Sequence, residues 1–165
     1  MQSVIYTVRQ LSGRMGSTIL CKIDIFNAFN SIMRRACVSE ADNIDPLLGC
    51  WSSWKLASPT LITSSGYGLT AVTGLFQGDP ISPVLFCAGI KPLMEEIKIK
   101  FPELEDLSYL DDEVIYGTPE AITRVIAFIQ DRLAKLGMKV NQSKCELYAG
   151  TPLPTDAVPV QQVIK

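Results

Sequence analysis

Two adjacent aspartates, Asp111 and Asp112, follow Tyr109 and Leu110 in a segment flanked by apolar residues on both sides. This pattern predicts two strands joined by a tight acidic turn. Neighbouring carboxylates at a hairpin tip repel each other and add nothing to a core. A divalent cation over the pair would make it favourable, because hard cations such as Mg²⁺ bind carboxylate oxygens. An acidic turn alone is most often simply solvated, so the rest of the chain has to decide between these interpretations.

The size and composition of the chain predict one globular domain. It has 165 residues, of which 47% are hydrophobic, enough to bury a substantial core. No apolar run approaches the roughly 20 residues that span a bilayer. The first residues, Met1-Gln2-Ser3, lack the basic and apolar regions of a signal peptide. We therefore expect an intracellular protein without a membrane partner, with nucleus and cytoplasm both open.

The cysteines and the absence of histidine exclude several kinds of site. There are five cysteines, widely spaced and without a C-x-x-C pair, and no histidine. A zinc site of the usual Cys/His type is thereby excluded, as is nucleophilic catalysis by Ser-His or Cys-His pairs. Buried free thiols in a reducing compartment are the interpretation that remains.

The net charge of −2 argues against strong nucleic-acid binding by this segment alone. Affinity for phosphates comes mainly from clustered lysines and arginines. Any nucleic-acid function therefore requires basic residues supplied by another segment.

Periodicity and capping signals predict the order of elements in the first half of the chain. The expected elements are a helix over 4–11, a strand over 18–25, a helix from 28 to about 37, a helix over 45–56, and two strands at 60–64 and 68–72. Trp51 and Trp54 lie three residues apart on one helical face and are predicted to pack in the core.

The second half begins with a helix start at Asp79-Pro80. The expected elements are a helix to about residue 100 disturbed at Gly89 and Pro92, the acidic hairpin, a helix opened by Thr118-Pro119 that ends before Gly137, and a strand pair at 138–140 and 145–148. Cys87 is predicted to lie in the core. The order favours an α+β fold with helices behind a small, mainly antiparallel sheet.

Asp24 ends the first predicted strand. If that strand and the acidic hairpin are neighbours in the sheet, Asp24 and Asp111 face each other at one edge. Two carboxylates there could bridge a pair of Mg²⁺ ions about 4 Å apart, which would stabilise the attacking and leaving oxygens in phosphoryl transfer. Such chemistry depends on positioning and charge neutralisation, and it suits a site without histidine.

Three motifs in this order resemble the palm domain of reverse transcriptases, the RNA-dependent DNA polymerases, and most closely those of non-LTR retrotransposons. The motifs are Asp24-Ile25-Phe26-Asn27-Ala28-Phe29-Asn30-Ser31, Gln77-Gly78-Asp79-Pro80-Ile81-Ser82-Pro83, and Tyr109-Leu110-Asp111-Asp112. The similarity extends from about residue 19 to 147. It implies a palm with a small ferredoxin-like or RRM-like sheet over 1–150, which includes a remnant of the fingers at the N-terminus, and a loop or linker tail over 151–165.

The resemblance implies a nucleotidyltransferase that adds dNTPs to a primer 3′-hydroxyl. Asp24 and Asp111 would be the ligands of two Mg²⁺ ions, with Mn²⁺ also possible, and Asp112 would support a metal or its bound waters. Asp24 as a simple helix cap is the alternative at that position.

The resemblance also implies nucleotide-binding residues. The N–H groups of Ile25, Phe26, Asn27 and Ala28 would lie under the triphosphate, and Phe29 would be an aromatic gate that excludes a 2′-hydroxyl. Gln77 and Gly78 would border the nucleotide, and Lys144 would approach the pyrophosphate. Each has a structural alternative: Phe29 as a core aromatic, the Gln77 segment as a cap and turn, and Lys144 as a solvated lysine.

The complete enzyme of this family binds an RNA template, a DNA primer and dNTPs with fingers and a thumb, and this chain is expected to lack both. The isolated chain is therefore expected to polymerise poorly or not at all. Two alternatives stay open. One is a non-catalytic, domesticated remnant that acts in binding or scaffolding; the other is a different two-metal palm enzyme, such as a nucleotide cyclase or RNA-templated RNA polymerase.

Overall fold

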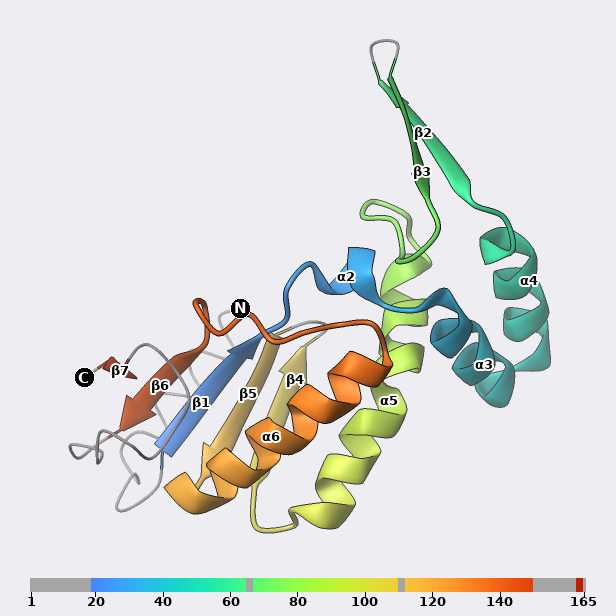
Figure 1. Ribbon diagram of the computed structural model, residues 1–165. Helices are drawn as coiled ribbons and strands as arrows, with labels where there is room; N and C mark the ends of the chain where they lie inside the picture. Colours follow the sequence, from blue (N-terminus) through green and yellow to red (C-terminus); the bar gives the residue numbers. More distant parts are fainter. Residues whose placement is uncertain (1–18, 65–66, 110–111, 150–162, 165) are drawn as a thin grey trace.

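The computed structural model of the chain describes residues 19–64, 67–109, 112–149 and 163–164. A five-stranded sheet in the order β4-β5-β1-β6-β7 forms one layer (Figure 1). Its strands are β1 (Ile19–Asp24), β4 (Glu105–Tyr109), β5 (Asp112–Gly117), β6 (Glu146–Ala149) and β7 (Val163–Ile164). All neighbours are antiparallel except the parallel pair β6 and β7. The expected α+β fold with a small antiparallel sheet is confirmed.

Two long helices, α5 (Ser82–Lys100) and α6 (Pro119–Lys135), cover one face of this sheet (Figure 1). In β1, Ile19, Cys21 and Ile23 alternate into the core beneath the helices, as expected for a strand with one covered face. The predicted cap of α6 is also confirmed, because the Thr118 hydroxyl accepts a hydrogen bond from the Ala121 N–H.

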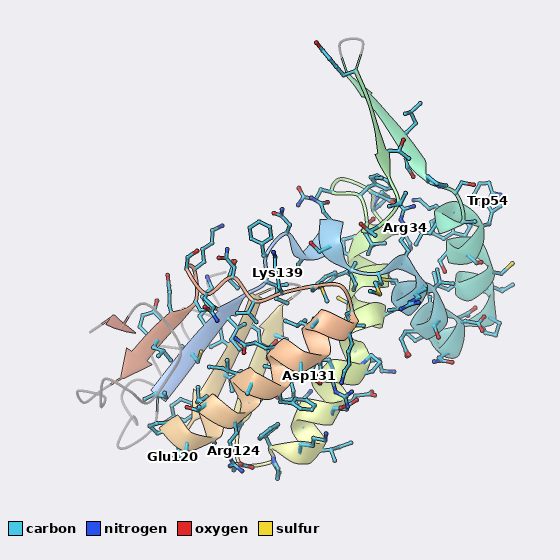
Figure 2. The ribbon with its side chains drawn as sticks, viewed as in Figure 1. Arg34, Trp54, Glu120, Arg124, Asp131 and Lys139 are labelled. Atoms are coloured by element: carbon cyan, nitrogen blue, oxygen red, sulfur yellow. The ribbon has the colours of Figure 1, made fainter. Side chains whose placement is uncertain are left out.

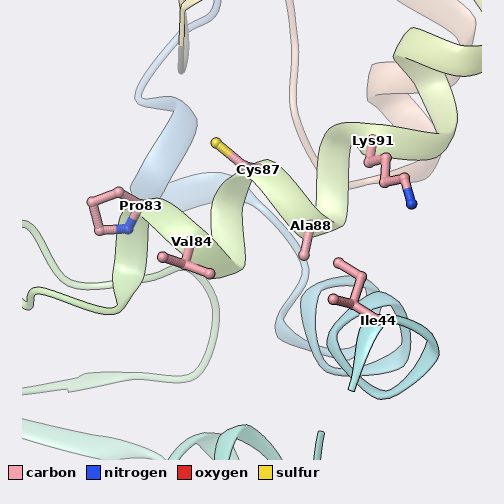
Figure 3. A pocket seen from close by; sticks show the side chains of 6 residues that line it. All are labelled: Ile44, Pro83, Val84, Cys87, Ala88 and Lys91. Atoms are coloured by element: carbon pink, nitrogen blue, oxygen red, sulfur yellow. The ribbon is translucent and has the colours of Figure 1, made fainter. Parts of the chain in front are cut away.

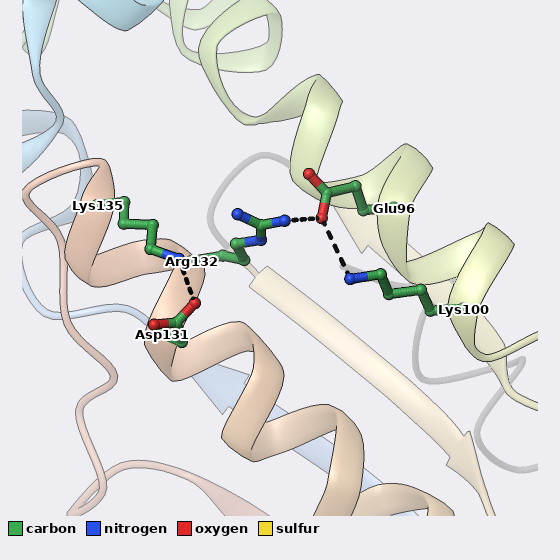
Figure 4. A network of polar contacts seen from close by, with 5 residues as sticks. All are labelled: Glu96, Lys100, Asp131, Arg132 and Lys135. Carbon is green, nitrogen blue, oxygen red and sulfur yellow. Dashed lines mark hydrogen bonds and ion pairs between the residues drawn. The ribbon is translucent and has the colours of Figure 1, made fainter.

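The two covering helices are joined by charged side chains (Figure 4). Glu96 of α5 pairs with Arg132 of α6 and with Lys100 on its own helix. Asp131 and Lys135 form a further pair along α6. Of these three pairs, Glu96–Arg132 joins the two helices that support the sheet, and each of the other two lies within one helix.

A second group of elements lies around the N-terminal half of α5 (Figure 1). Its members are α2 (Ala28–Ser31), α3 (Arg34–Ile44), α4 (Pro46–Leu56), and a separate two-stranded sheet of β2 (Thr60–Ser64) and β3 (Tyr67–Ala71). The β2–β3 hairpin extends away from the five-stranded sheet (Figure 1). The predictions of α4 and of both hairpin strands are confirmed.

The prediction of one helix from 28 to about 37 is wrong. The chain is extended at Ile32 (φ −57°, ψ 135°), which separates α2 from α3. Here the Ile32 carbonyl accepts from the Gly74 N–H at 3.0 Å, and the Met33 N–H donates to the Leu136 carbonyl at 2.9 Å. Contacts with distant segments therefore replace helical hydrogen bonds at this position.

The prediction that both tryptophans pack in the core is also wrong. The side chain of Trp54 is 77% exposed and that of Trp51 is 39% exposed. The buried residues of α4 are Gly49, Ser52 and Leu56, so its inward face is made mainly of small residues. Cys87, likewise predicted to be in the core, is exposed. It lines an apolar pocket of about 530 Å³ between α3 and α5 (Figure 3).

Two further predictions differ from the structure. Residues 138–140 do not pair with the strand that follows: β6 pairs with β1, while Val140 forms a single bridge with Ile25. The long helix α5 begins at Ser82 and runs unbroken past Gly89 and Pro92.

At the chain ends, the predicted helix over 4–11 lies outside the described residues. In the stretch predicted as a loop or linker tail, residues 163–164 form β7. No helix in the described part of the chain is long and apolar enough to cross a membrane.

Candidate active site

The acidic residues of the first and third motifs come from neighbouring strands. Asp24, the last residue of β1, is the register partner of Asp112, the first residue of β5. Directly opposed residues in antiparallel strands have Cα atoms about 4.5–5.5 Å apart. The two strands are thus neighbours, as the sequence analysis required. Asp111 lies outside the described residues.

The alternation of β1 places Asp24 on the face away from the covering helices. Ile23 and Ile25 belong to the core beneath α5 and α6, whereas Asp24 is half-buried. Glu113 is the register partner of Ile23 and is buried, so it belongs to the helix-covered side. Burial raises the pKa of Glu113 to about 7, although a hydrogen bond with Ser108 opposes the shift. Glu113 therefore does not belong to the Asp24 cluster.

The surroundings of Asp24 fit a hard divalent cation. The Cys145 sulfur lies 3.5 Å from the Asp24 main-chain nitrogen and accepts its N–H. Burial raises the pKa of the Cys145 thiol, and the Asp24 charge raises it further. The thiol therefore stays protonated near neutrality and leaves carboxylate oxygens as the available donors, which suit Mg²⁺ or Mn²⁺. Within the described residues, which omit Asp111, no group of three or more histidine, cysteine, aspartate or glutamate side chains is arranged to hold a metal ion, at Asp24 or at any other position.

The segment after Asp24 turns sharply into α2. Asn27 has positive backbone dihedrals (φ 45°, ψ 46°), and its carbonyl accepts from the N–H groups of Asn30 and Ser31. The Phe26 N–H donates to the Lys139 carbonyl at 2.9 Å, so this predicted phosphate donor already has a partner. Ile25 and Ala28 are buried.

Two lysines that follow α6, Lys139 and Lys144, are both exposed but differ in their contacts. The ammonium of Lys139 (Figure 2) lies over the Phe26 ring, 5.3 Å from its centroid. The structure thus brings Lys139 to the Asp24 segment. Both lysines follow α6 in irregular backbone, where no periodicity in the sequence distinguishes them.

The predicted gate, Phe29, is fixed by packing. Its half-buried ring stacks on the buried ring of Phe86, with centroids 4.6 Å apart and planes inclined by 15°. The Phe29 carbonyl also accepts from the Leu75 N–H at 2.6 Å. Phe29 therefore packs against the core, as the structural alternative for this residue proposed. The same packing holds its ring in one position at the start of α2.

The Gln77-Gly78 turn lies exposed before α5. Gly78 has φ +89°, a conformation that disfavours any side chain. The Asp79 carboxylate accepts from the Ile81 N–H and the Ser82 hydroxyl, which ties the turn to the start of α5. It also pairs with Lys55 of α4, and this hydrogen bond is the main cause that lowers the pKa of Asp79.

A buried arginine, missed by the sequence analysis, supports the same turn (Figure 2). Arg34 donates from Nε to the Gly74 carbonyl at 2.9 Å and from Nη1 to the Ser58 carbonyl at 3.1 Å. Its guanidinium also lies 5.5 Å from the centroid of the Phe76 ring. An arginine on a helix is usually solvated, so the sequence carried no signal for this burial.

Comparisons with solved structures show a shared fold. The apo telomerase of Candida tropicalis superimposes with a TM-score of 0.66 at 11% identity, over 91% of this chain and 32% of that one. The telomerase of Candida albicans, solved in complex with the TWJ fragment of telomeric RNA, gives a TM-score of 0.58 at 11% identity, over 93% of this chain and 31% of that one.

Sequence comparisons show the family. The retrotransposable element SLACS 132 kDa protein of Trypanosoma brucei gambiense is 31% identical over 139 residues, which cover 78% of this chain and 11% of that protein. This chain therefore spans about a tenth of that relative and about a third of the telomerase chains. A family model described as "Reverse transcriptase (RNA-dependent DNA polymerase)" matches residues 1–161. The chain belongs to the reverse transcriptase family.

Proposed function

We propose that this chain is the palm of an RNA-directed DNA polymerase, which adds dNTPs to the 3′-hydroxyl of a primer by two-metal nucleotidyl transfer. The observation that carries the proposal is the register of β1 and β5, which pairs Asp24 with Asp112 at the ends of adjacent strands. This register puts the first-motif acid opposite Asp112, the residue that follows Asp111 in the chain.

Asp24, Asp111 and Asp112 would hold two Mg²⁺ ions, or Mn²⁺, on the open face of the sheet. When bound, such ions stabilise the attacking and leaving oxygens of the transfer. The carboxylates themselves orient the site and need not move a proton. Their position at strand ends, on a sheet supported by two helices, gives the rigidity that a catalytic site requires.

The neighbouring residues would bind the nucleotide. The Phe29 ring, held by its stack on Phe86, would press on C2′ of the sugar and exclude a ribonucleotide. Gln77 and Gly78 would border the base. The Phe26 N–H already donates to the Lys139 carbonyl, so the main-chain donors proposed for the triphosphate are those of Ile25, Asn27 and Ala28. Lys139 is nearer to this segment than Lys144 and is the better candidate for the leaving pyrophosphate.

The chain would act as part of a longer retroelement polymerase inside the cell. Its net charge of −2 gives it little affinity of its own for an RNA template or a DNA primer. Fingers and thumb regions would supply the basic residues that hold both strands. The retrotransposable-element relative, of which this chain spans 11%, supports this assignment.

Metal binding provides the test. Calorimetric titration of the chain with Mn²⁺ is expected to give binding that is lost or weakened at least tenfold in Asp24→Asn and Asp111→Asn. The matched control is Asp131→Asn, an exposed acid on α6 that pairs with Lys135. Circular dichroism would establish that each variant is folded. Equal Mn²⁺ affinity in all four proteins would reject the two-metal proposal and favour a non-catalytic remnant.

A further inference from the structure

We propose that Lys55, on a helix outside the catalytic strands, is a positioning residue for the Gln77-Gly78 turn and thereby for nucleotide binding. The inference rests on the proposed function, because it assumes that this turn borders the nucleotide. Lys55 precedes the turn by more than twenty residues and is not part of any of the three motifs.

Lys55 lies between two partners. Its ammonium pairs with the Asp79 carboxylate and also lies over the ring of Trp51, 4.8 Å from the centroid. The side chains of Lys55 and Asp79 are only 28% and 16% exposed. Partial burial strengthens the attraction between the charges and limits competition from water. The Trp51 ring therefore helps to hold the Lys55 side chain. This contact explains why Trp51 lies on the surface of α4.

Asp79 connects Lys55 to the Gln77-Gly78 turn through hydrogen bonds of its own. One carboxylate oxygen accepts from the Ile81 N–H at 3.3 Å, and the other accepts from the Ser82 hydroxyl at 3.2 Å. The Asp79 N–H donates to the Phe76 carbonyl across the turn, at 3.4 Å. The Ser82 N–H also donates to the Asp79 carbonyl, at 3.1 Å. Among the side-chain contacts of Asp79, the ion pair with Lys55 is the shortest and the one with a charged donor.

Lys55 itself is held on a rigid element. The Asp45 carboxylate caps the start of α4, with hydrogen bonds from the N–H groups of Leu47 and Leu48 at 2.7 and 3.2 Å. In its middle, Gly49 lies so close to Asp42 of α3 that a Cβ would collide with that residue. Because α4 cannot shift easily on α3, Lys55 provides a fixed point from which the turn is oriented.

This arrangement predicts different effects on stability and on binding. A partly exposed ion pair contributes little to the free energy of folding, so removal of Lys55 is expected to leave the fold intact. The Gln77-Gly78 turn would lose its lateral support, and small displacements of positioning groups weaken the interactions they make. We therefore expect weaker nucleotide affinity at nearly unchanged stability.

The experiment measures the dissociation constant of dATP with Mg²⁺ by calorimetry, together with the urea unfolding midpoint. Lys55→Met, which keeps the stem and removes the charge, is expected to raise the dissociation constant by about fivefold to tenfold. Lys55→Arg is expected to restore most of the affinity. The control Lys135→Met removes an exposed ion pair on α6 and is expected to change neither quantity.

The possible outcomes separate this inference from the function on which it rests. If wild-type binding depends on Asp24 but Lys55→Met binds within twofold of wild type, the positioning role is rejected and the polymerase proposal stands. If the wild type does not bind dATP, or if Asp24→Asn binds it as well as the wild type does, the proposed function fails, and this inference fails with it. If Lys55→Met and Lys55→Gln both unfold, the role of Lys55 is structural, and the inference is also overturned.

Discussion

Arg34 donates from Nε to the carbonyl oxygen of Gly74 at 2.9 Å, and it is buried at the junction between the two parts of the molecule. Its Nη1 donates to the Ser58 carbonyl at 3.1 Å. Ser58 precedes β2 and Gly74 follows β3, so one guanidinium holds both ends of the β2–β3 hairpin. The hairpin itself extends away from the sheet (Figure 1), and this clamp is the contact that defines its base.

Replacement of Arg34 by methionine is expected to lower the free energy of unfolding by about 2–4 kcal/mol, because two buried carbonyls lose hydrogen bonds to a charged donor. Urea denaturation followed by circular dichroism measures the effect. The adjacent Arg35 is exposed, so Arg35→Met is the matched control and is expected to change stability by less than about 0.5 kcal/mol. Similar losses in both variants would contradict the clamp.

Asp79 gives a pH-dependent prediction. Its hydrogen bond with Lys55 holds the pKa of Asp79 below its usual 3.8 in the folded chain. The stability that this carboxylate contributes is therefore present above pH 3.8 and is lost as the pH falls from there through the folded pKa. Asp79→Asn is expected to be less stable than wild type by about 0.5–1 kcal/mol at pH 7, because it removes the partly exposed ion pair with Lys55.

The measurement for Asp79 is urea unfolding of both proteins between pH 7 and pH 2.5. The difference in their free energies of unfolding is expected to stay constant down to about pH 5 and to shrink below pH 3.8. A difference that grows as the pH falls would have the wrong sign and would contradict the assigned role. Lys55→Met should reduce the same pH dependence, since it removes the main cause of the shift.

The central part of the fold, including the neighbouring position of the two strands that carry Asp24 and Asp112, could be predicted from the sequence. A buried strand that ends in Asp24 and a hairpin around Asp112 have clear alternation and turn signals, and antiparallel neighbours are the usual arrangement of such strands. Their pairing in β1 and β5 followed. The motif order supplied the rest of the candidate site, although Asp111 lies outside the described residues and the roles of the site residues stay predictions.

Positions that depend on contacts between distant segments could not be predicted. The break at Ile32 arises from hydrogen bonds with Gly74 and Leu136, which local propensity does not encode. The two tryptophans suggested a buried face of α4, yet α4 packs through Gly49 and Ser52, whose small side chains allow close approach and carry little hydropathy signal. Lys55 and Arg34 were missed for the same reason, because their partners are 24 and 40 residues away.

Phe29 offers a test of sugar selection. dATP and ATP differ only at the 2′-hydroxyl, so the ratio of their dissociation constants with Mg²⁺ measures the gate. Phe29→Leu is expected to lower the preference for dATP by about tenfold or more, because the smaller side chain admits the hydroxyl. It should also lower the free energy of unfolding by about 1 kcal/mol through loss of the stack on Phe86.

The control for Phe29 is its partner in the stack. Phe86→Leu removes the same ring contact from the buried side, but the Phe29 ring itself is still present to exclude the hydroxyl. It is expected to reduce stability while it retains most of the preference for dATP. If Phe86→Leu and Phe29→Leu relax sugar selection equally, the preference depends on packing of α2, and the gate assignment is wrong.

Gly49 tests whether α4 is a fixed support. Alanine at an exposed helical position normally stabilises a helix relative to glycine by up to about 1 kcal/mol. At Gly49 a Cβ would collide with Asp42, including its Cα and Cβ atoms. These atoms cannot move aside as the end of a long, flexible side chain could. Steric overlap should outweigh propensity, and Gly49→Ala is expected to lower the free energy of unfolding by about 1–3 kcal/mol. Ser53→Ala, on the exposed side of α4, should be neutral or slightly stabilising.

Because α4 carries Lys55, Gly49→Ala should also weaken dATP binding under conditions where the variant remains folded. If Gly49→Ala lowers stability but leaves dATP affinity unchanged, α4 does not orient the Gln77-Gly78 turn.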